Sequence, residues 1–192
     1  MFFSKAPKAL LLGLFAFSAT AAAEDFNYNF VQATYGQVDF DELDVDGNGF
    51  GIGGSMALSD SFHLFGAYTT ADMDFGVDLN QLEAGLGYNA PISETVDLVA
   101  SLAYVSAEVE AAGFSADDNG YGLGVGLRAM LAPSFEVDGG ISYVDMGDGC
   151  DDVGFSDGFL YHFTEQFSAG ASAGWGDDVS SYSLNARMFF GN

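Results

Sequence analysis

Basic residues are scarce in this 192-residue chain, which has 4 Lys and Arg against 28 Asp and Glu and a formal charge of −24. Nucleic-acid binding requires a basic surface that neutralises phosphate, so this composition excludes it. A single cysteine, Cys150, excludes an intrachain disulfide framework. Intrinsic disorder is excluded as well, because 49% of the residues are hydrophobic and 15% are aromatic. With only three prolines beside 26 glycines, the composition favours a closely packed, strand-rich chain.

Long hydrophobic runs are also missing, apart from one near the N-terminus. Lys5 and Lys8 come first, an apolar stretch covers 9–17, and three alanines occupy 21–23. This order predicts a secretory signal peptide over residues 1–23, followed by a single domain over 24–192. The apolar stretch is roughly half as long as a membrane-spanning helix, which argues against an uncleaved anchor. The mature chain then keeps every carboxylate but only two basic residues, Arg128 and Arg187.

Apolar residues alternate with small or polar residues through almost all of the mature chain. In 121–127, for example, every second residue is glycine, and 82–88, 167–175 and 182–190 follow a similar period. A period of two predicts β-strands with one apolar face. We expect ten strands, with eight as the alternative because the segment near 146–163 is weak. The expected spans are 26–38, 48–58, 62–71, 79–89, 96–107, 119–130, 135–145, 153–163, 167–176 and 180–190.

The second face of these strands consists mostly of Gly, Ser, Ala, Asn and Gln rather than charged residues. A soluble surface normally carries lysine, which the mature chain lacks. We therefore expect the apolar face to contact lipid, and the small face to line a tight interior. Only helices and closed barrels pair all backbone groups within lipid. The predicted fold is all-β, a closed antiparallel transmembrane up-and-down β-barrel. The residues expected to contact lipid near mid-membrane are Leu86, Leu123, Val125 and Ala171.

The connections between the expected strands fall into two alternating classes. Short ones lie at 59–61, 89–95, 131–134 and 164–166, and acidic ones at 39–47, 72–78, 108–118, 145–152 and 177–179. Transmembrane barrels have short periplasmic turns and longer extracellular loops, so we predict that the acidic connections are extracellular. Nine aromatic residues near strand ends are expected in the two interfacial girdles. They are Tyr28, Tyr68, Tyr88, Tyr104, Tyr121, Tyr143, Tyr161, Trp175 and Tyr182.

With these features, the mature chain resembles the small outer-membrane β-barrel proteins of Gram-negative bacteria, the OmpX and OmpA-barrel type. Its final strand is similar to the C-terminal signal that the barrel-assembly machinery reads, although Gly191 and Asn192 follow the last aromatic residue. The resemblance implies an outer-membrane location and a monomer whose partners are membrane lipid, lipopolysaccharide and the assembly machinery. Such proteins include adhesins, structural proteins, narrow pores and a few enzymes. The alternating residues of the final strand are Tyr182, Leu184, Ala186, Met188 and Phe190.

Two histidines, His63 and His162, are the candidate general bases. Both lie beside expected periplasmic turns, whereas enzymes resembling this fold place catalytic histidines near the extracellular rim. A general base must lie within hydrogen-bond reach of the group it activates, and neither histidine has a carboxylate two residues away. We predict structural roles for both histidines and no enzymatic activity.

Asp44, Asp46 and Asn48 have the spacing of the first half of an EF-hand loop, with Gly49 at its sixth position. Ser55 occupies the position where that loop needs a bidentate glutamate. We favour a hairpin tip in which residues 47–49 provide positive φ angles, and we predict no dedicated metal or cofactor site. Weak binding of divalent cations by the clustered carboxylates of the extracellular loops is expected, because their mutual repulsion has to be relieved.

Five charged residues fall on the small, inward face: Arg128, Arg187, Glu83, Glu136 and Asp138. A charge inside a barrel needs a partner or water. We favour a salt-bridged network that fills the interior, because eight-stranded barrels are just filled by side chains and ten strands add little room. The alternative is a polar constriction in a narrow channel for small solutes or ions. The predicted function is a structural or surface-interaction role with acidic extracellular loops, and the channel is the alternative.

Overall fold

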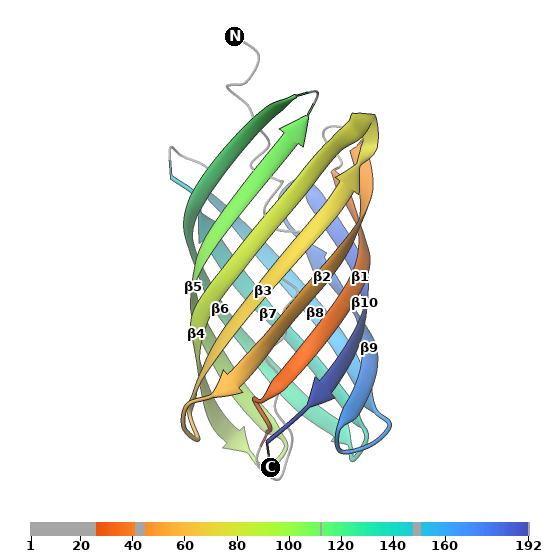
Figure 1. The fold of residues 1–192 in the computed structure, drawn as a ribbon. Helices are drawn as coiled ribbons and strands as arrows, with labels where there is room; N and C mark the ends of the chain where they lie inside the picture. The colour runs from red at the N-terminus through yellow and green to blue at the C-terminus, as the bar shows by residue number, and fades with distance from the viewer. Residues whose placement is uncertain (1–25, 41–44, 112, 148–150, 192) are drawn as a thin grey trace.

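The computed structural model describes residues 26–40, 45–111, 113–147 and 151–191. Within these residues, antiparallel strands close into one barrel (Figure 1). The ten-stranded up-and-down barrel is therefore confirmed, and the eight-stranded alternative is wrong. No helix in the described ranges is long and apolar enough to cross a membrane. The elements are β1 (Phe30–Phe40), β2 (Val45–Ala57), β3 (Phe62–Met73), the 3-10 turn η2 (Asp74–Gly76), β4 (Val77–Ser93), β5 (Val96–Ala111), β6 (Phe114–Ala132), β7 (Phe135–Asp145), β8 (Asp151–His162), β9 (Phe167–Trp175) and β10 (Val179–Phe189).

The first and last strands close the barrel. Phe30 at the start of β1 lies opposite Phe189 on β10 and opposite Ser55 on β2. Each strand therefore has two hydrogen-bonded neighbours, which pairs the backbone groups as a lipid environment requires. We call the end that holds the β2–β3, β4–β5, β6–β7 and β8–β9 connections the short-turn end. The opposite end, which holds the other five hairpin connections, is the acidic end.

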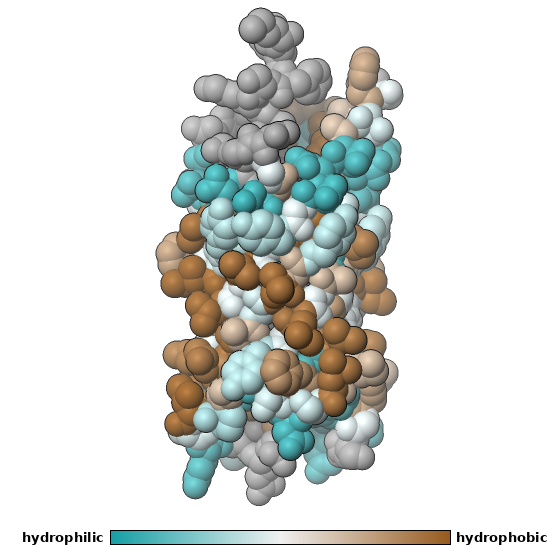
Figure 2. All heavy atoms as spheres, turned by 90° about the vertical axis from the view of Figure 1, so that its left-hand side faces the viewer, coloured by the Kyte–Doolittle hydropathy of each residue, from teal (hydrophilic) through white to brown (hydrophobic). Residues whose placement is uncertain are grey.

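Alternate residues of every strand point away from the interior. In the middle of the barrel most of these outward residues are apolar, so the outer wall is apolar there. Large hydrophobic side chains there keep about half of their surface exposed, for example Leu86 at 42%, Leu123 at 46% and Val125 at 50%. Ala171 is half-buried on the corresponding outward face of β9. Figure 2 shows the result as a brown apolar band around the middle, with teal hydrophilic side chains above it. An apolar band of this kind is what a lipid bilayer stabilises.

Near the acidic end the inner wall is also apolar, contrary to the expectation of a small, polar interior throughout. One buried cluster includes Phe40 on β1, Leu79 on β4 and Val179 on β10. A second cluster includes Val105 on β5 and Val144 on β7. The alternation of each strand continues here, but its inward positions carry branched and aromatic side chains instead of glycine and serine. The interior at this level is packed like an ordinary protein core.

The predicted acidic loops are largely strand in the structure. β5 continues to Ala111 and β6 begins at Phe114, so Glu108 lies opposite Asp117 within a hydrogen-bonded ladder. The 108–118 loop prediction is therefore wrong, and the 39–47, 72–78 and 145–152 loops are likewise shorter than predicted. Pairing of backbone groups continues beyond the apolar band, where the outward residues are acidic and the apolar residues lie on the inner face. The pattern expected of a strand whose outward face contacts lipid therefore no longer applies.

The predicted hairpin tip at residues 47–49 is also wrong. Gly47, Asn48 and Gly49 lie inside β2, opposite Val38, Gln37 and Gly36 on β1. None of the three has a positive φ angle. Glycine is needed at position 47 because β3 approaches it closely: a Cβ atom there would lie 2.7 Å from the carbonyl oxygen of Asp72 on β3.

The first strand begins four residues later than predicted, at Phe30 rather than at residue 26. Tyr28 therefore precedes the strand and is only 4% exposed, so its assignment to an outer aromatic girdle is wrong. Within β1, Phe30 faces inward and the next residue, Val31, faces outward. The two parities of apolar residues in this segment thus belong to the two faces of one wall.

Candidate functional site

Arg128 and Glu136 form a buried ion pair inside the barrel at the short-turn end. The Nε of Arg128 donates to Oε1 of Glu136 over 2.5 Å, and a second guanidinium nitrogen contacts the same oxygen. Both side chains are 1% exposed. They come from β6 and β7, whose inward positions converge on each side of the tight turn at residues 133–134. Two hydrogen bonds to one carboxylate offset part of the cost of burying the two charges.

His162 extends this pair to β8. Its Nε2 lies 2.9 Å from Oε2 of Glu136, and its Nδ1 lies 2.7 Å from Oγ of Ser168 on β9. A carboxylate only accepts hydrogen bonds, so Nε2 carries the proton that is donated to Glu136. In the neutral ring, Nδ1 then accepts the hydroxyl proton of Ser168. Sequence reasoning missed this role, although the turn at 163–166 places His162 and Ser168 opposite each other in one hairpin.

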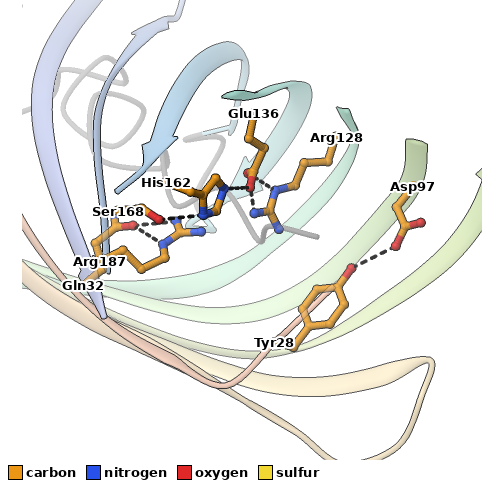
Figure 3. Close-up of polar contacts among 8 residues, drawn as sticks. All are labelled: Tyr28, Gln32, Asp97, Arg128, Glu136, His162, Ser168 and Arg187. Carbon is orange, nitrogen blue, oxygen red and sulfur yellow. Dashed lines mark hydrogen bonds and ion pairs between the residues drawn. The ribbon is translucent and has the colours of Figure 1, made fainter. Parts of the chain in front are cut away.

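Arg187 on β10 continues the same line of side chains. It lies opposite Ser168 in the β9–β10 register, and its Nε donates to Oε1 of Gln32 on β1 over 2.8 Å. Its guanidinium carbon also sits 4.1 Å from the centre of the Phe30 ring, a cation–π contact. Polar side chains from six adjacent strands, β1 and β10 to β6, therefore lie in one row (Figure 3). We call it the polar row; its members are Gln32, Arg187, Ser168, His162, Glu136 and Arg128.

The residues before β1 complete the interior at this end. The ring of Tyr28 stacks on that of His63, with 4.2 Å between centres, and its hydroxyl donates to Oδ2 of Asp97 over 3.4 Å. Burial raises the pKa of the Tyr28 hydroxyl, so this group stays a donor at neutral pH. The ring of Phe26 lies 5.1 Å from the guanidinium carbon of Arg128. Phe26 and Tyr28 thus lie inside the barrel at the level of the polar row.

The remaining predicted charges, Glu83 and Asp138, line a cavity of about 110 Å³ farther along the interior. Asp138 lies opposite Arg128 in the β6–β7 register and interacts electrostatically with both arginines. Glu83 is 6% exposed and has no hydrogen bond or ion pair with any residue that the structure describes. The structure therefore joins Arg128 directly to Glu136, keeps Asp138 near both arginines, and leaves Glu83 apart from the polar row.

Ser168, His162 and Glu136 are linked in the order of a nucleophile, a base and an acid. Such an arrangement supports acyl transfer only when a substrate carbonyl can reach the serine oxygen. Ser168 is 0% exposed, and Arg187 lies opposite it in the register. The geometry favours a structural role for these three residues, as a hydrogen-bonded bridge between β7, β8 and β9.

Of the three candidate metal ligands, the structure describes Asp46 and Asn48, which both lie on the outward face of β2. Asp44 lies outside the described residues, as do Cys150 and the predicted signal peptide. Asn48 points outward from β2, and its Oδ1 accepts a hydrogen bond from Gln37 over 3.2 Å. Across the described part of the chain, no group of three His, Cys, Asp or Glu side chains could hold a metal ion.

The outer wall carries one carboxylate that sequence reasoning did not single out. Asp157 is exposed on the outward face of β8, between Phe155 and Phe159, which are 55% and 42% exposed. Its register partners are Gly139 on β7 and Ala173 on β9, which offer no polar side chain. The sequence does indicate its outward position, because Asp157 lies two residues from both Phe155 and Phe159 and so falls on the same face of the strand as they do.

Above the apolar band, outward-pointing carboxylates face each other across neighbouring strands. Asp78 on β4 lies directly opposite Asp72 on β3 and Glu110 on β5, so that three carboxylates form one row. Opposed like charges on a sheet are destabilising unless something neutralises them. We call the full set the acidic collar; its directly opposed pairs are Asp39 with Asp46, Asp72 with Asp78, Asp78 with Glu110, Glu108 with Asp117, and Asp145 with Asp151.

Comparison with known families agrees with this architecture. The family model described as an outer membrane protein beta-barrel domain matches residues 9–173. The chain belongs to this family. It is accordingly an integral outer-membrane β-barrel protein of the Gram-negative type, as the sequence predicted. No curated protein sequence matches it.

Several solved structures are similar to this chain at low sequence identity. An outer membrane channel from Pseudomonas putida F1 has a TM-score of 0.55 at 9% identity, covering 85% of this chain and 96% of that one. Neisserial surface protein A has a TM-score of 0.43 at 17% identity, with coverages of 84% and 95%. The KdgM porin in complex with disordered oligogalacturonate has a TM-score of 0.49 at 10% identity, with coverages of 84% and 99%. At these identities the likeness concerns the fold alone.

Proposed function

We propose that this barrel is a structural and surface-interaction protein, whose acidic collar binds divalent cations and through them the phosphate groups of lipopolysaccharide. The observation that carries the proposal is the set of directly opposed carboxylates at the edge of the apolar band. Lipopolysaccharide headgroups are anionic, so contact between them and the collar requires a bridging cation. Oxygen ligands from carboxylates and phosphates are those that Mg²⁺ and Ca²⁺ prefer.

In the part of the chain that the structure describes, no basic residue lies at the level of the collar, which supports the same proposal. Both arginines of the mature chain lie in the polar row at the opposite end, so neither neutralises the collar. Counter-ions from outside can therefore relieve the repulsion within the collar. Two aromatic side chains add apolar surface beyond the collar: Phe75 in η2 and Phe114 at the start of β6, which are 88% and 77% exposed. Their exposure in adjacent hairpins suits contact with sugars or with another protein.

The experiment compares the unfolding of the barrel in vesicles with and without Ca²⁺. The test variant Asp78→Asn/Glu110→Gln removes two charges from the collar, and the control Asp60→Asn/Glu94→Gln removes two from short turns. In the presence of a chelator, the collar variant should be more stable than the wild type, because the repulsion is gone. Added Ca²⁺ should stabilise the wild type and the control and remove most of that difference. Equal responses to Ca²⁺ in all three proteins would reject the collar as the binding surface.

The alternative function, a narrow channel, rests on the cavity between the polar row and the apolar clusters. The polar row and the buried apolar clusters fill the interior on either side of it, which favours a filled interior over an open path. Conductance in planar bilayers separates the two functions. We expect no discrete current steps for the wild type. Discrete current steps in the wild type, with an ion selectivity that differs in Glu83→Gln, would make the channel the primary function.

A further inference from the structure

We propose that the cavity inside the barrel binds a single monovalent metal cation, Na⁺ or K⁺, with the carboxylate of Glu83 as its charged ligand. The site is separate from the acidic collar, and the inference does not depend on the proposed surface function. It follows from the burial of Glu83, the charges of the inner wall, and the oxygen atoms that line the cavity.

Glu83 is a buried carboxylate without a protein partner. Its side chain is 6% exposed and lines the cavity. The residues opposite it in the ladder are Ala67 on β3 and Val105 on β5, whose side chains cannot donate a hydrogen bond. An uncompensated carboxylate in such a place is costly, so either a cation or a proton has to accompany it.

The charges of the surrounding wall favour a cation. Among the described residues, four carboxyl groups but only two guanidinium groups face the interior between the cavity and the short-turn end. Glu136 is held by Arg128, and the remaining guanidinium group, Arg187, interacts electrostatically with Glu136 and Asp138. Even a protonated His162 would leave one carboxylate without a counter-charge. Of the four carboxyl groups, Glu83 on β4 is the one whose strand is not adjacent to β6, the strand of Arg128. The four carboxyl groups are Glu83, Asp97, Glu136 and Asp138.

The cavity offers oxygen ligands and enough room for an ion with some water. Its volume of about 110 Å³ exceeds the space of one water molecule several times. Hydroxyl-bearing residues line it from four strands, and Oγ of Ser55 is buried without a hydrogen-bond partner among the described residues. Glycines keep the space open: a Cβ atom at Gly124 would lie 2.5 Å from Oγ of Ser101. The hydroxyl-bearing residues are Ser55, Ser101, Ser142 and Ser156.

The ligand set selects a monovalent ion. Ca²⁺ and Mg²⁺ are bound in proteins by several carboxylates or with substrate phosphates. Here one carboxylate is available beside neutral hydroxyl groups, and the described residues contain no group of three metal-binding side chains. An ion of low charge density matches one negative charge and neutral oxygen atoms.

The experiment follows thermal unfolding of the folded, detergent-solubilised barrel, with a chelator present so that divalent ions do not contribute. NaCl and KCl are compared with N-methylglucamine chloride at the same ionic strength, because this bulky cation screens charges but does not fit the cavity. We expect Na⁺ or K⁺ to raise the melting temperature of the wild type by a few degrees in a saturable manner. The rise should disappear in Glu83→Gln and persist in the control Glu94→Gln, whose site is the exposed turn between β4 and β5.

Three results would overturn the proposal. The first is the same Na⁺ and K⁺ response in wild type and Glu83→Gln, which would place binding elsewhere. The second is a wild type that does not distinguish the small cations from the bulky one. The third is an infrared band of a protonated carboxyl group that is lost in Glu83→Gln, which would mean that a proton takes the place of the ion. If Glu83→Gln fails to fold, Ser142→Ala replaces it. This variant keeps the charge and should shift the midpoint of the response to a higher cation concentration, and an unchanged midpoint would count against the site.

Discussion

Arg128 and Glu136 pair across the two-residue connection from β6 to β7, and both are almost completely buried. His162 takes the second oxygen of the same carboxylate. The carboxylate of Glu136 is thus shared by two donors from neighbouring strands, which fixes the relative position of β6, β7 and β8 at the short-turn end. A shared carboxylate makes the three residues energetically dependent on one another.

Replacing Arg128 with methionine should therefore cost about 3–5 kcal/mol of unfolding free energy, because Glu136 is left buried without its counter-charge. Adding Glu136→Gln should recover part of this loss, since the uncompensated charge is removed. Urea unfolding of the two single variants and the double variant in lipid vesicles measures the coupling. Asp138→Asn serves as the comparison and should recover less than Glu136→Gln, because Asp138 is not the direct partner. A negligible loss in Arg128→Met would mean that water already solvates this end of the interior.

Neighbouring positions on β6 allow a direct test of the two faces. Val125→Arg places a charge on the outer wall and should destabilise the barrel by roughly 2–4 kcal/mol, the cost of a basic residue near the bilayer midplane. Gly124→Ser adds a small polar group to the inner wall and should cost much less, provided that the hydroxyl of Ser101 adjusts. Matched unfolding titrations in vesicles measure both. Equal losses would contradict the assignment of the faces.

The orientation of the barrel is predicted from the lengths and charges of its connections. Gly113 lies at the tip of the β5–β6 hairpin with a φ of 84°, and Ser134 lies in the turn between β6 and β7. A cysteine introduced at Gly113 should react with a membrane-impermeant reagent in intact cells, whereas one at Ser134 should not. Both variants are made with Cys150 replaced by serine, so that the native thiol does not contribute. The opposite labelling pattern would invert the topology.

Sequence alone predicts the barrel because lipid imposes one requirement on every strand. Leu86, Leu123 and Val125 are apolar where they face the bilayer, and the period of two follows directly. Beyond the apolar band that requirement is absent, so the paired residues Glu108 and Asp117 carry no signal of strand. The predicted loops were too long for this reason.

The interior depends on register, which the sequence does not reveal beyond single hairpins. Arg128 and Glu136 are eight residues apart across one turn and could be paired from sequence. The contact of His162 with Glu136 spans 26 residues and depends on the register between β7 and β8. The contact of Arg187 with Gln32 spans 155 residues and exists only because the barrel closes. Contacts between the first and last strands therefore cannot be predicted from sequence patterns within single hairpins.

Asp157 provides the last prediction, because it is a carboxylate on the wall that faces lipid. Its outward neighbours along β8 are aromatic, and it has no hydrogen bond or ion pair with any described residue. Acidic residues on the lipid face of a barrel destabilise it, though less than basic ones do. Asp157→Asn removes the charge at nearly constant shape and should stabilise the barrel in vesicles by about 1 kcal/mol. Asp60→Asn, in the exposed turn between β2 and β3, is the matched control and should change stability little. Urea titrations of both variants provide the comparison. Destabilisation by Asp157→Asn alone would show that the carboxylate has a favourable partner at the lipid surface, and the barrel would then have to be treated as part of a larger membrane assembly.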